Sequence, residues 1–385
     1  MKSNTNYHSV NWIDGMKINK NHFIDQENAL QNAINNAQKN GITPVNYGLL
    51  PDFSDKGSTV DISVSIDGQS TIEVLLNKCQ AITLGGYLIN ISEQTKPLLD
   101  QSGYILKKQY KIDSKETEFY IVITINPFVR VPVGNADPNE EPPRHPFILP
   151  EYKLNVLTKS EVNTREIGLH HLTLAKVIVE EGVPALVENF IPPCTSIQSH
   201  ADLKFTFNEI VTFFNMMESF SMHIIQKIYQ KKQTNELAHM VLHLSQNVIA
   251  FLNKAIPEFR MQNKYQAPIV MINKLASLAR EIKNSLDAYI GTGKEELLNY
   301  LTDWCDLNQG AFENVLIDML EIKYEHTDIN ASLHKVSGFT KLMLSLFKKL
   351  NELDYIGKKE DSGIFVKENI VEDTETKGRR SFLLD

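Results

Sequence analysis

The sequence predicts an α+β protein, in which a β-sandwich-like domain is followed by an α-helical bundle and a short C-terminal tail. Two observations carry this prediction. Before about residue 195, apolar and polar residues alternate in short segments bounded by glycine and proline, as they do in half-buried strands. After about residue 199, apolar residues recur every three or four positions, as they do on the buried face of a helix.

A polar helix is expected ahead of the strands, over residues 25–38. Gly41 and Pro44 follow it and are typical of a helix end. Its small and apolar residues stand at helical spacing and are Ala29, Leu30, Ala33, Ile34 and Ala37.

Three turn signals predict three hairpins in the β-rich half. Asp67-Gly68 favours a two-residue type I′ turn, because that turn needs positive φ at both central residues. Gly85-Gly86 and Glu180-Glu181-Gly182 give the other two turns. The strands that they join are 60–66 with 72–76, 81–84 with 87–91, and 172–179 with 183–187.

Two further strands, 119–125 and 152–158, flank a long proline-rich segment. The first is a β-branched run of the kind found in buried strands. Residues 134–150 hold five prolines and are expected to form a loop, since proline fits neither a helix interior nor a central strand. This loop is either a packed surface meander or a contact for a partner.

The helical half contains four long amphipathic segments, residues 207–228, 237–251, 268–289 and 329–350, and two shorter ones, 295–308 and 311–324. Their apolar stripes are wider than the two-position seam of an isolated coiled coil. Wide stripes favour a multi-helix bundle and leave room for contact between subunits.

The chain of 385 residues is long enough for two or three domains. The change of period and the Pro192-Pro193 pair place the first boundary near residue 195. We expect a β-rich domain over 1–195, a helical bundle over 196–326, a C-terminal helix or reduced domain over 327–356, and a charged tail over 357–385 that is flexible or ordered by a partner.

Composition narrows the function classes. The formal net charge of −8 repels phosphates, so we expect no nucleic acid partner. Cys79, Cys194 and Cys305 are too sparse for a disulfide framework, which fits a reducing compartment. The chain lacks both a signal-peptide pattern and an apolar run of ~20 residues. We therefore expect a cytoplasmic protein without direct membrane insertion.

We expect no catalytic, cofactor-binding or metal-binding residues. His239 and His243 are four apart on a predicted helix, but Met240 stands where a zincin needs its glutamate, so two histidines beside a core stripe are the favoured interpretation. A metal-dependent hydrolase remains the third alternative. Residues 291–294 lack the phosphate-loop pattern and predict helix caps, with a capping box over Thr292–Glu295.

The most specific motif lies at the N-terminus, over residues 10–18 and 22–26. Physically, Trp12, Met16 and Phe23 would form a small apolar plug at a Gly-Met turn, while ordinary core packing is the favoured interpretation for Trp12 and Phe23 individually. The candidate interface residues are Trp12, Gly15, Met16, His22, Phe23 and Gln26.

This motif resembles the start of TssK, the baseplate protein of the type VI secretion system. That family opens with V-x-W-x-[DE]-G-M, continues with H-F-x-x-Q, and has an I-P-P step before its helices, here Ile191-Pro192-Pro193. The resemblance implies a homotrimer with a β "shoulder" that binds the wedge proteins TssF and TssG, a trimerising helical "neck", and a "head" that contacts the membrane complex. It implies no catalytic residue.

The apolar stripes of the predicted bundle supply the candidates for the core of such a trimer. These are Phe207, Phe214, Met217, Ile224, Leu237, Leu244, Ile272 and Leu286.

About thirty residues follow the last predicted helix, fewer than the ~40 that an independent core usually needs. We therefore expect a divergent short TssK without a full head, whose tail or helical tip meets a membrane-complex protein and joins it to the wedge. The alternative function is that of a phage-tail or tailocin receptor-binding protein, since its shoulder would look similar.

Overall fold

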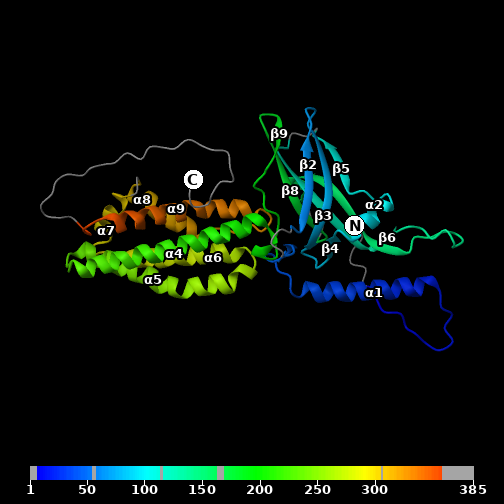
Figure 1. Cartoon of the computed structure of the whole chain (residues 1–385), viewed down its shortest axis with the longest axis horizontal. Helices are drawn as coiled ribbons and strands as arrows, with labels where there is room; N and C mark the ends of the chain where they lie inside the picture. The colour runs from blue at the N-terminus through cyan, green and yellow to red at the C-terminus, as the bar shows by residue number, and fades with distance from the viewer. Residues whose placement is uncertain (1–6, 54–57, 113–115, 163–168, 305–306, 358–385) are drawn as a thin grey trace. The chain divides into compact units, whose positions relative to one another are not determined.

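The computed structural model describes residues 7–53, 58–112, 116–162, 169–304 and 307–357. The chain divides into two compact units. The β unit comprises residues 1–203, 265–268 and 325–330, and the helical unit comprises 204–264, 269–324 and 331–385. Figure 1 follows the chain from its first helix through the strands to the helices of the second half. The α+β class is confirmed, while residues 358–385 of the predicted tail lie outside the described residues.

Two antiparallel sheets form the β unit. In the first sheet, the long strand β3 (Thr71–Ile82) pairs with β1 (Gly48–Leu49), β2 (Val60–Ile66), β4 (Leu88–Ile91) and β5 (Lys107–Lys111). The second sheet has the order β7-β6-β8-β9, with β6 (Glu118–Val133), β7 (Phe147–Thr158), β8 (His171–Glu180) and β9 (Val183–Leu186). Two short helices, α2 (Thr95–Gln101) and α3 (Lys159–Val162), complete the connections.

All three predicted hairpins are present, but the type I′ turn is wrong. β2 and β3 are joined by four residues, 67–70, and positive φ occurs at Ser70. The reason is the Asp67 carboxylate, which accepts hydrogen bonds from the backbone N–H groups of Gln69 and Thr71 at 2.9 and 2.8 Å. These hydrogen bonds to the Asp67 side chain replace the hydrogen bond of a type I′ backbone turn. The hydrogen bond from the Thr71 N–H also lowers the pKa of Asp67.

The proline-rich connection is shorter than predicted, because β7 begins at Phe147 and contains Pro150. Pro150 lies opposite Arg130, where the register between β6 and β7 shifts. β7 is an edge strand of its sheet, and edges and irregularities are where a strand tolerates a residue without an N–H group. The loop proper is therefore residues 134–146.

The segment expected to be a domain boundary is held inside the β unit. Leu49 donates its N–H to the Pro193 carbonyl at 2.8 Å, and Thr195 donates its N–H to the Leu49 carbonyl at 3.0 Å. Leu49 and Cys194 are fully buried. The Pro192-Pro193 pair thus marks the end of the β-rich sequence. The Pro193 carbonyl nevertheless accepts a hydrogen bond from Leu49 of β1.

Each of the six predicted segments of the helical half contains a helix, but the two shorter helices end earlier than predicted. The six are α4 (Ala201–Gln230), α5 (Glu236–Met261), α6 (Ile269–Asp287), α7 (Lys294–Thr302), α8 (Gln309–Leu320) and α9 (Ile329–Glu352). Aromatic side chains join the first two: the ring of Phe259 on α5 lies 4.5 Å from Phe207 and 5.4 Å from Phe214. Most of α9 belongs to the same compact unit as the other five helices.

The capping box predicted at Thr292 is wrong. Gly293 is the N-cap of α7, with φ of 139° and no side-chain cap. The Thr292 hydroxyl instead donates to the Tyr289 carbonyl of the preceding turn, so it is not available to α7. Lys294 fixes the start of the helix, with Nζ 2.7 Å from Asp287 and 2.6 Å from Glu313.

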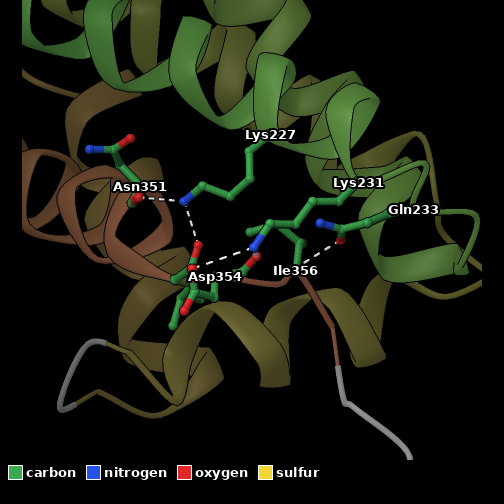
Figure 2. A network of polar contacts seen from close by, with 7 residues as sticks. Lys227, Lys231, Gln233, Asn351, Asp354 and Ile356 are labelled. Atoms are coloured by element: carbon green, nitrogen blue, oxygen red, sulfur yellow. Dashed lines mark hydrogen bonds and ion pairs between the residues drawn. The ribbon is translucent and has the colours of Figure 1, made fainter.

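Side chains from the end of α4 and from the turn between α4 and α5 hold the end of α9, an arrangement that we call the α9 clasp (Figure 2). Lys227 donates to the carbonyls of Asn351 and Leu353, and Lys231 donates to that of Asp354. Gln233 accepts the Ile356 N–H at 3.0 Å. Ammonium groups on these carbonyls satisfy acceptors that a helix end leaves open and match the negative end of its dipole. Burial lowers the pKa of Lys227, as does the charge of Lys231.

Replacing Asn235 by alanine tests this clasp. Its Oδ1 caps α5 by accepting the Ala238 N–H at 2.8 Å, and its Nδ2 donates to Tyr355 and Ile356. Asn308→Ala is the matched control, because Asn308 makes the equivalent cap to Ala311 at 2.8 Å. We expect the control to lose about 1 kcal/mol of unfolding free energy and Asn235→Ala about 2–3 kcal/mol. Denaturant titration measures both, and equal losses would show that the clasp contributes nothing.

Candidate functional site

The N-terminal motif lies at the start of helix α1 (Lys20–Lys39), which begins five residues earlier than predicted. Asn19 is its N-cap and accepts the Asn21 N–H at 2.9 Å. In return, the Asn19 N–H donates to Nδ1 of His22 at 3.2 Å. His22 thus occupies the place that glutamate usually takes in a capping box, which explains why the sequence did not reveal the helix start.

Residues 7–18 form an arm that folds back on α1. Gly15 has φ of 79°, and the Met16 N–H donates to the Ile13 carbonyl at 3.2 Å, which closes the Gly-Met turn. The Val10 N–H donates to Oε1 of Gln26 at 3.2 Å. A shallow cavity of about 430 Å³ lies along the arm and is lined by residues that include Met16 and His22.

The aromatic members of the motif also meet. The ring of Trp12 lies 6.2 Å from that of His22 and 6.3 Å from that of Phe23. The structure therefore brings the six candidate interface residues together around the start of α1: Met16, His22 and Gln26 form hydrogen bonds, Gly15 takes the positive φ of the turn, and Trp12, His22 and Phe23 form ring contacts.

Within the β unit, the arm and α1 are held against β6 and the turns of the sheets. The ring of Tyr7 stacks on that of Phe128 at 4.3 Å, and Arg130 of β6 forms an ion pair with Glu27. Asn35 is buried, and its carbonyl would lie 2.9 Å from a Cβ added to Gly86. One side of α1 is thus packed so closely that only a glycine fits opposite it.

The other side of α1 is apolar and exposed. Trp12 and Phe23 are 47% and 57% exposed, so the expectation that they pack in a core is wrong. The physical reason is that α1 buries the side that holds Ala29 and Asn35, which leaves Phe23, Leu30 and Ile34 on the exposed side of the helix. We call this surface the α1 apolar face; it consists of Phe23, Leu30 and Ile34 of α1 and of Trp12, whose ring meets that of Phe23, and each is between 47% and 57% exposed.

Two members of this face, Leu30 and Ile34, were not predicted to be interaction residues. Their helical spacing was visible in the sequence, but it was assigned to helix packing, since periodicity shows which residues share a face and not whether that face is covered. Contiguous apolar surface of this kind marks interaction sites more often than isolated exposed side chains do.

The residues predicted to form the core of a trimer are not available for contact between subunits. All eight are buried within the helical unit of a single chain: Phe207, Phe214, Met217, Ile224, Leu237, Leu244, Ile272 and Leu286. They form the core of that unit. A contact between copies must therefore use other residues, and the trimer itself stays a prediction.

The two histidines considered for metal binding do not share a ligand set. His239 is exposed, whereas Nε2 of His243 lies 3.1 Å from Asn247 and its ring contacts Tyr289 edge-on at 5.7 Å. Within the described ranges, no three His, Cys, Asp or Glu side chains are grouped to hold a metal ion.

One buried histidine is structural. Nε2 of His326 lies 2.8 Å from the Tyr47 carbonyl, and its ring packs against the Tyr47 ring at 4.8 Å. Burial lowers the pKa of His326, so it is neutral at pH 7 and donates this hydrogen bond. The arrangement positions the 325–330 segment within the β unit.

Comparison with known proteins gives a structural answer only. No family model and no curated protein sequence matches the chain. A crystal structure of TssK superposes with a TM-score of 0.51 at 17% identity, over 89% of this chain and 69% of that one. TssK from the EAEC type VI secretion system, solved with a nanobody, gives 0.41 at 14% identity, over 84% and 96%. A chain of a TssK-TssF-TssG baseplate subcomplex gives 0.38 at 13% identity, over 90% and 99%. On the first of these superpositions, the chain has the fold of TssK.

Proposed function

We propose that this chain is a structural adaptor of a type VI secretion baseplate, which connects the baseplate wedge to the membrane anchor complex. The observation that carries the proposal is the α1 apolar face. Trp12 and Phe23 of the TssK-like motif lie on it, in a chain that has the TssK fold.

The α1 apolar face is the proposed contact for wedge proteins of the TssF and TssG type. It offers an aromatic centre, Trp12 and Phe23, flanked along the helix by Leu30 and Ile34. Aromatic and aliphatic anchors of this kind supply most of the affinity in protein interfaces. In a homotrimer, several such faces would act together, so that modest single contacts add through effective concentration.

The membrane-side contact is proposed for the end of the helical unit or the segment beyond residue 357. The clasp around α9 fixes where that segment leaves the helical unit. None of the helices in the part of the chain that the structure describes is long and apolar enough to cross a membrane. We propose a cytoplasmic location, docked at the inner membrane through partners.

Co-expression with the TssF- and TssG-type proteins of the same secretion system tests the proposal. We expect the full chain to co-purify with them as a stable complex in size-exclusion chromatography. Failure to bind them, together with binding to a glycan array, would replace this function with that of a receptor-binding protein.

Deletion of residues 358–385 separates the two ends of the adaptor. If these residues meet the membrane complex, the truncated chain keeps its wedge proteins and loses the membrane-complex protein in a pull-down. Unchanged capture of both would assign the membrane-side contact to the helical unit instead.

A further inference from the structure

A cleft of about 340 Å³ lies in the β unit, between an edge of the first sheet and an edge of the second. One wall consists of residues 103–108, which include the start of β5, and the other consists of residues 152–155 of β7. In the part of the chain that the structure describes, each of these strands is paired on one side only, β5 with β3 and β7 with β6. We call this feature the β5–β7 cleft, and both of its walls are strand edges.

The hydrogen bond between the two walls shows how the backbone of β7 faces the cleft. The Tyr152 carbonyl accepts a hydrogen bond from the Tyr104 hydroxyl of the opposite wall, so this carbonyl points away from β6. Backbone groups two residues apart in a strand point to the same side. The N–H and C=O groups of Leu154 therefore also point toward the cleft, where they are placed to pair with an extended chain.

The charged side chains that line the cleft are all basic. They are Lys107, Lys108 and Lys153, in a chain whose net charge is −8. Lys107 and Lys153 form ion pairs with Glu73 and Glu151 at 2.7 and 2.9 Å, and such pairs at the surface contribute little. Nζ of Lys108 has no ion pair with any residue that the structure describes. The cleft therefore attracts negative charge on a protein that otherwise repels it.

Lys108 is the member of this group without a counter-charge, and it is partly buried. Its side chain leaves β5 on the same side as that of Tyr110, whose ring lies 5.8 Å from the ring of Phe119 in the second sheet. An ammonium group that is partly removed from water and lacks an anion is destabilised. A carboxylate bound in the cleft would offset this effect, because opposite charges attract more strongly away from bulk water.

We propose that the β5–β7 cleft is the docking site for an acidic, extended segment of a partner protein. The segment adds a strand to the edge of β7, with its main chain on Leu154 and its carboxylates on Lys108 and Lys153. In this mode of recognition, main-chain hydrogen bonds supply affinity and side chains supply specificity. The Tyr104 hydroxyl already occupies the Tyr152 carbonyl, so the pairing begins at Leu154.

The cleft shares no residue with the α1 apolar face, so this inference goes beyond the adaptor role. The two surfaces also differ in chemistry. The α1 apolar face offers aromatic and aliphatic side chains, whereas the cleft offers lysines and backbone groups.

A fluorescent eight-residue peptide of alternating Glu and Val is the first probe, with binding to the full chain measured by fluorescence anisotropy. We expect it to bind with a micromolar dissociation constant. The double variant Lys108→Glu, Lys153→Glu is expected to weaken this binding at least about 10-fold. The control is Lys335→Glu, Lys348→Glu, which makes the same change in net charge at two exposed positions of α9. We expect the control to bind the peptide nearly as the wild type does.

Reversing the charge of the peptide shows whether the two lysines act directly. A peptide of alternating Lys and Val is expected to bind the Lys108→Glu, Lys153→Glu variant at least about 10-fold more tightly than it binds the wild type. A loss of folding would weaken both peptides instead. If the α9 control weakens the acidic peptide as much as the cleft variant does, net charge alone explains the binding and the docking site is wrong.

Hydrogen exchange tests the added strand. We expect a saturating amount of the acidic peptide to slow exchange of the Leu154 amide at least about 10-fold. The Leu186 amide is the control, because it lies on the open edge of β9: the neighbouring Val187 N–H donates to Lys176 of β8, so the Leu186 N–H points the other way.

An N-methylated acidic peptide keeps the carboxylates and lacks the donors of a strand, so we expect it to bind at least about 10-fold more weakly. Equal affinity of the two acidic peptides, or unchanged exchange at Leu154, would overturn the proposal. These probes contain no wedge protein, so failure here leaves the adaptor role standing, and failure to bind the wedge proteins leaves the cleft standing.

Discussion

Replacing Phe23 and Leu30 together by aspartate is expected to abolish binding of the wedge proteins while the fold stays intact. Both side chains are more than half exposed, so the chain loses little core packing. In a complex they would be buried, and a carboxylate there would be desolvated without a partner. Each aromatic or aliphatic anchor of a protein interface contributes about 2 kcal/mol or more, which corresponds to about a 30-fold loss of affinity per residue.

Affinity for the purified TssF- and TssG-type complex, measured by surface plasmon resonance, gives the size of the effect. Ile105→Asp is the matched control, because Ile105 is 60% exposed in the same unit and lies outside the α1 apolar face. We expect the control to bind as the wild type does. Full binding by the double variant would show that the wedge contacts another surface, and circular dichroism confirms that all three proteins are folded.

Replacing Gly48 by alanine is expected to cause the largest loss of stability of any single methyl addition in the β unit, about 4 kcal/mol or more. Gly48 has φ of 114°, which side chains other than glycine rarely adopt. An added Cβ would lie 1.9 Å from the Pro193 carbonyl oxygen, well inside van der Waals contact. Backbone atoms cannot move aside like a flexible side chain, so β1 must separate from residues 193–195.

That separation would break a buried set of bonds. The Leu49 N–H bond to Pro193 is lost first, and the Leu49 carbonyl then loses its donors, the N–H and the hydroxyl of Thr195. Leu49 and Cys194, both fully buried, would be exposed to water. Denaturant unfolding measures the loss, and Gly68→Ala is the control, since no atom lies within 4 Å of its added Cβ and its φ is not positive. A loss below about 1 kcal/mol for Gly48→Ala would show that the pairing yields easily.

Local order was readable from the sequence where it depends on neighbours in the chain. The alternation over residues 60–66 and 72–76 gave a hairpin, and the three-to-four spacing from residue 207 gave α4, because the periods of strand and helix follow from backbone geometry alone. Errors arose where one side chain had two possible partners. Asp67 and Thr292 each bond to a backbone group of their own turn, which changed a type I′ turn and removed a helix cap.

The residues of the interaction surfaces could be predicted only in part from the sequence. The N-terminal motif pointed to Trp12 and Phe23, and the structure brings them together, but their exposure was not predicted. On α4, the apolar stripe was expected to form a seam between subunits. It is the core of the helical unit, and its members are buried within the single chain.

By itself, the sequence determined the order of strands and helices, the hairpins, and which residues share a face of each helix. Tertiary structure alone decided which of those faces is covered. Coverage depends on segments distant in the chain: Thr195 reaches Leu49 across 146 positions, and Phe259 of α5 stacks on Phe207 of α4. A periodic pattern carries no information about what lies opposite it, because burial is a property of two surfaces and the pattern describes one.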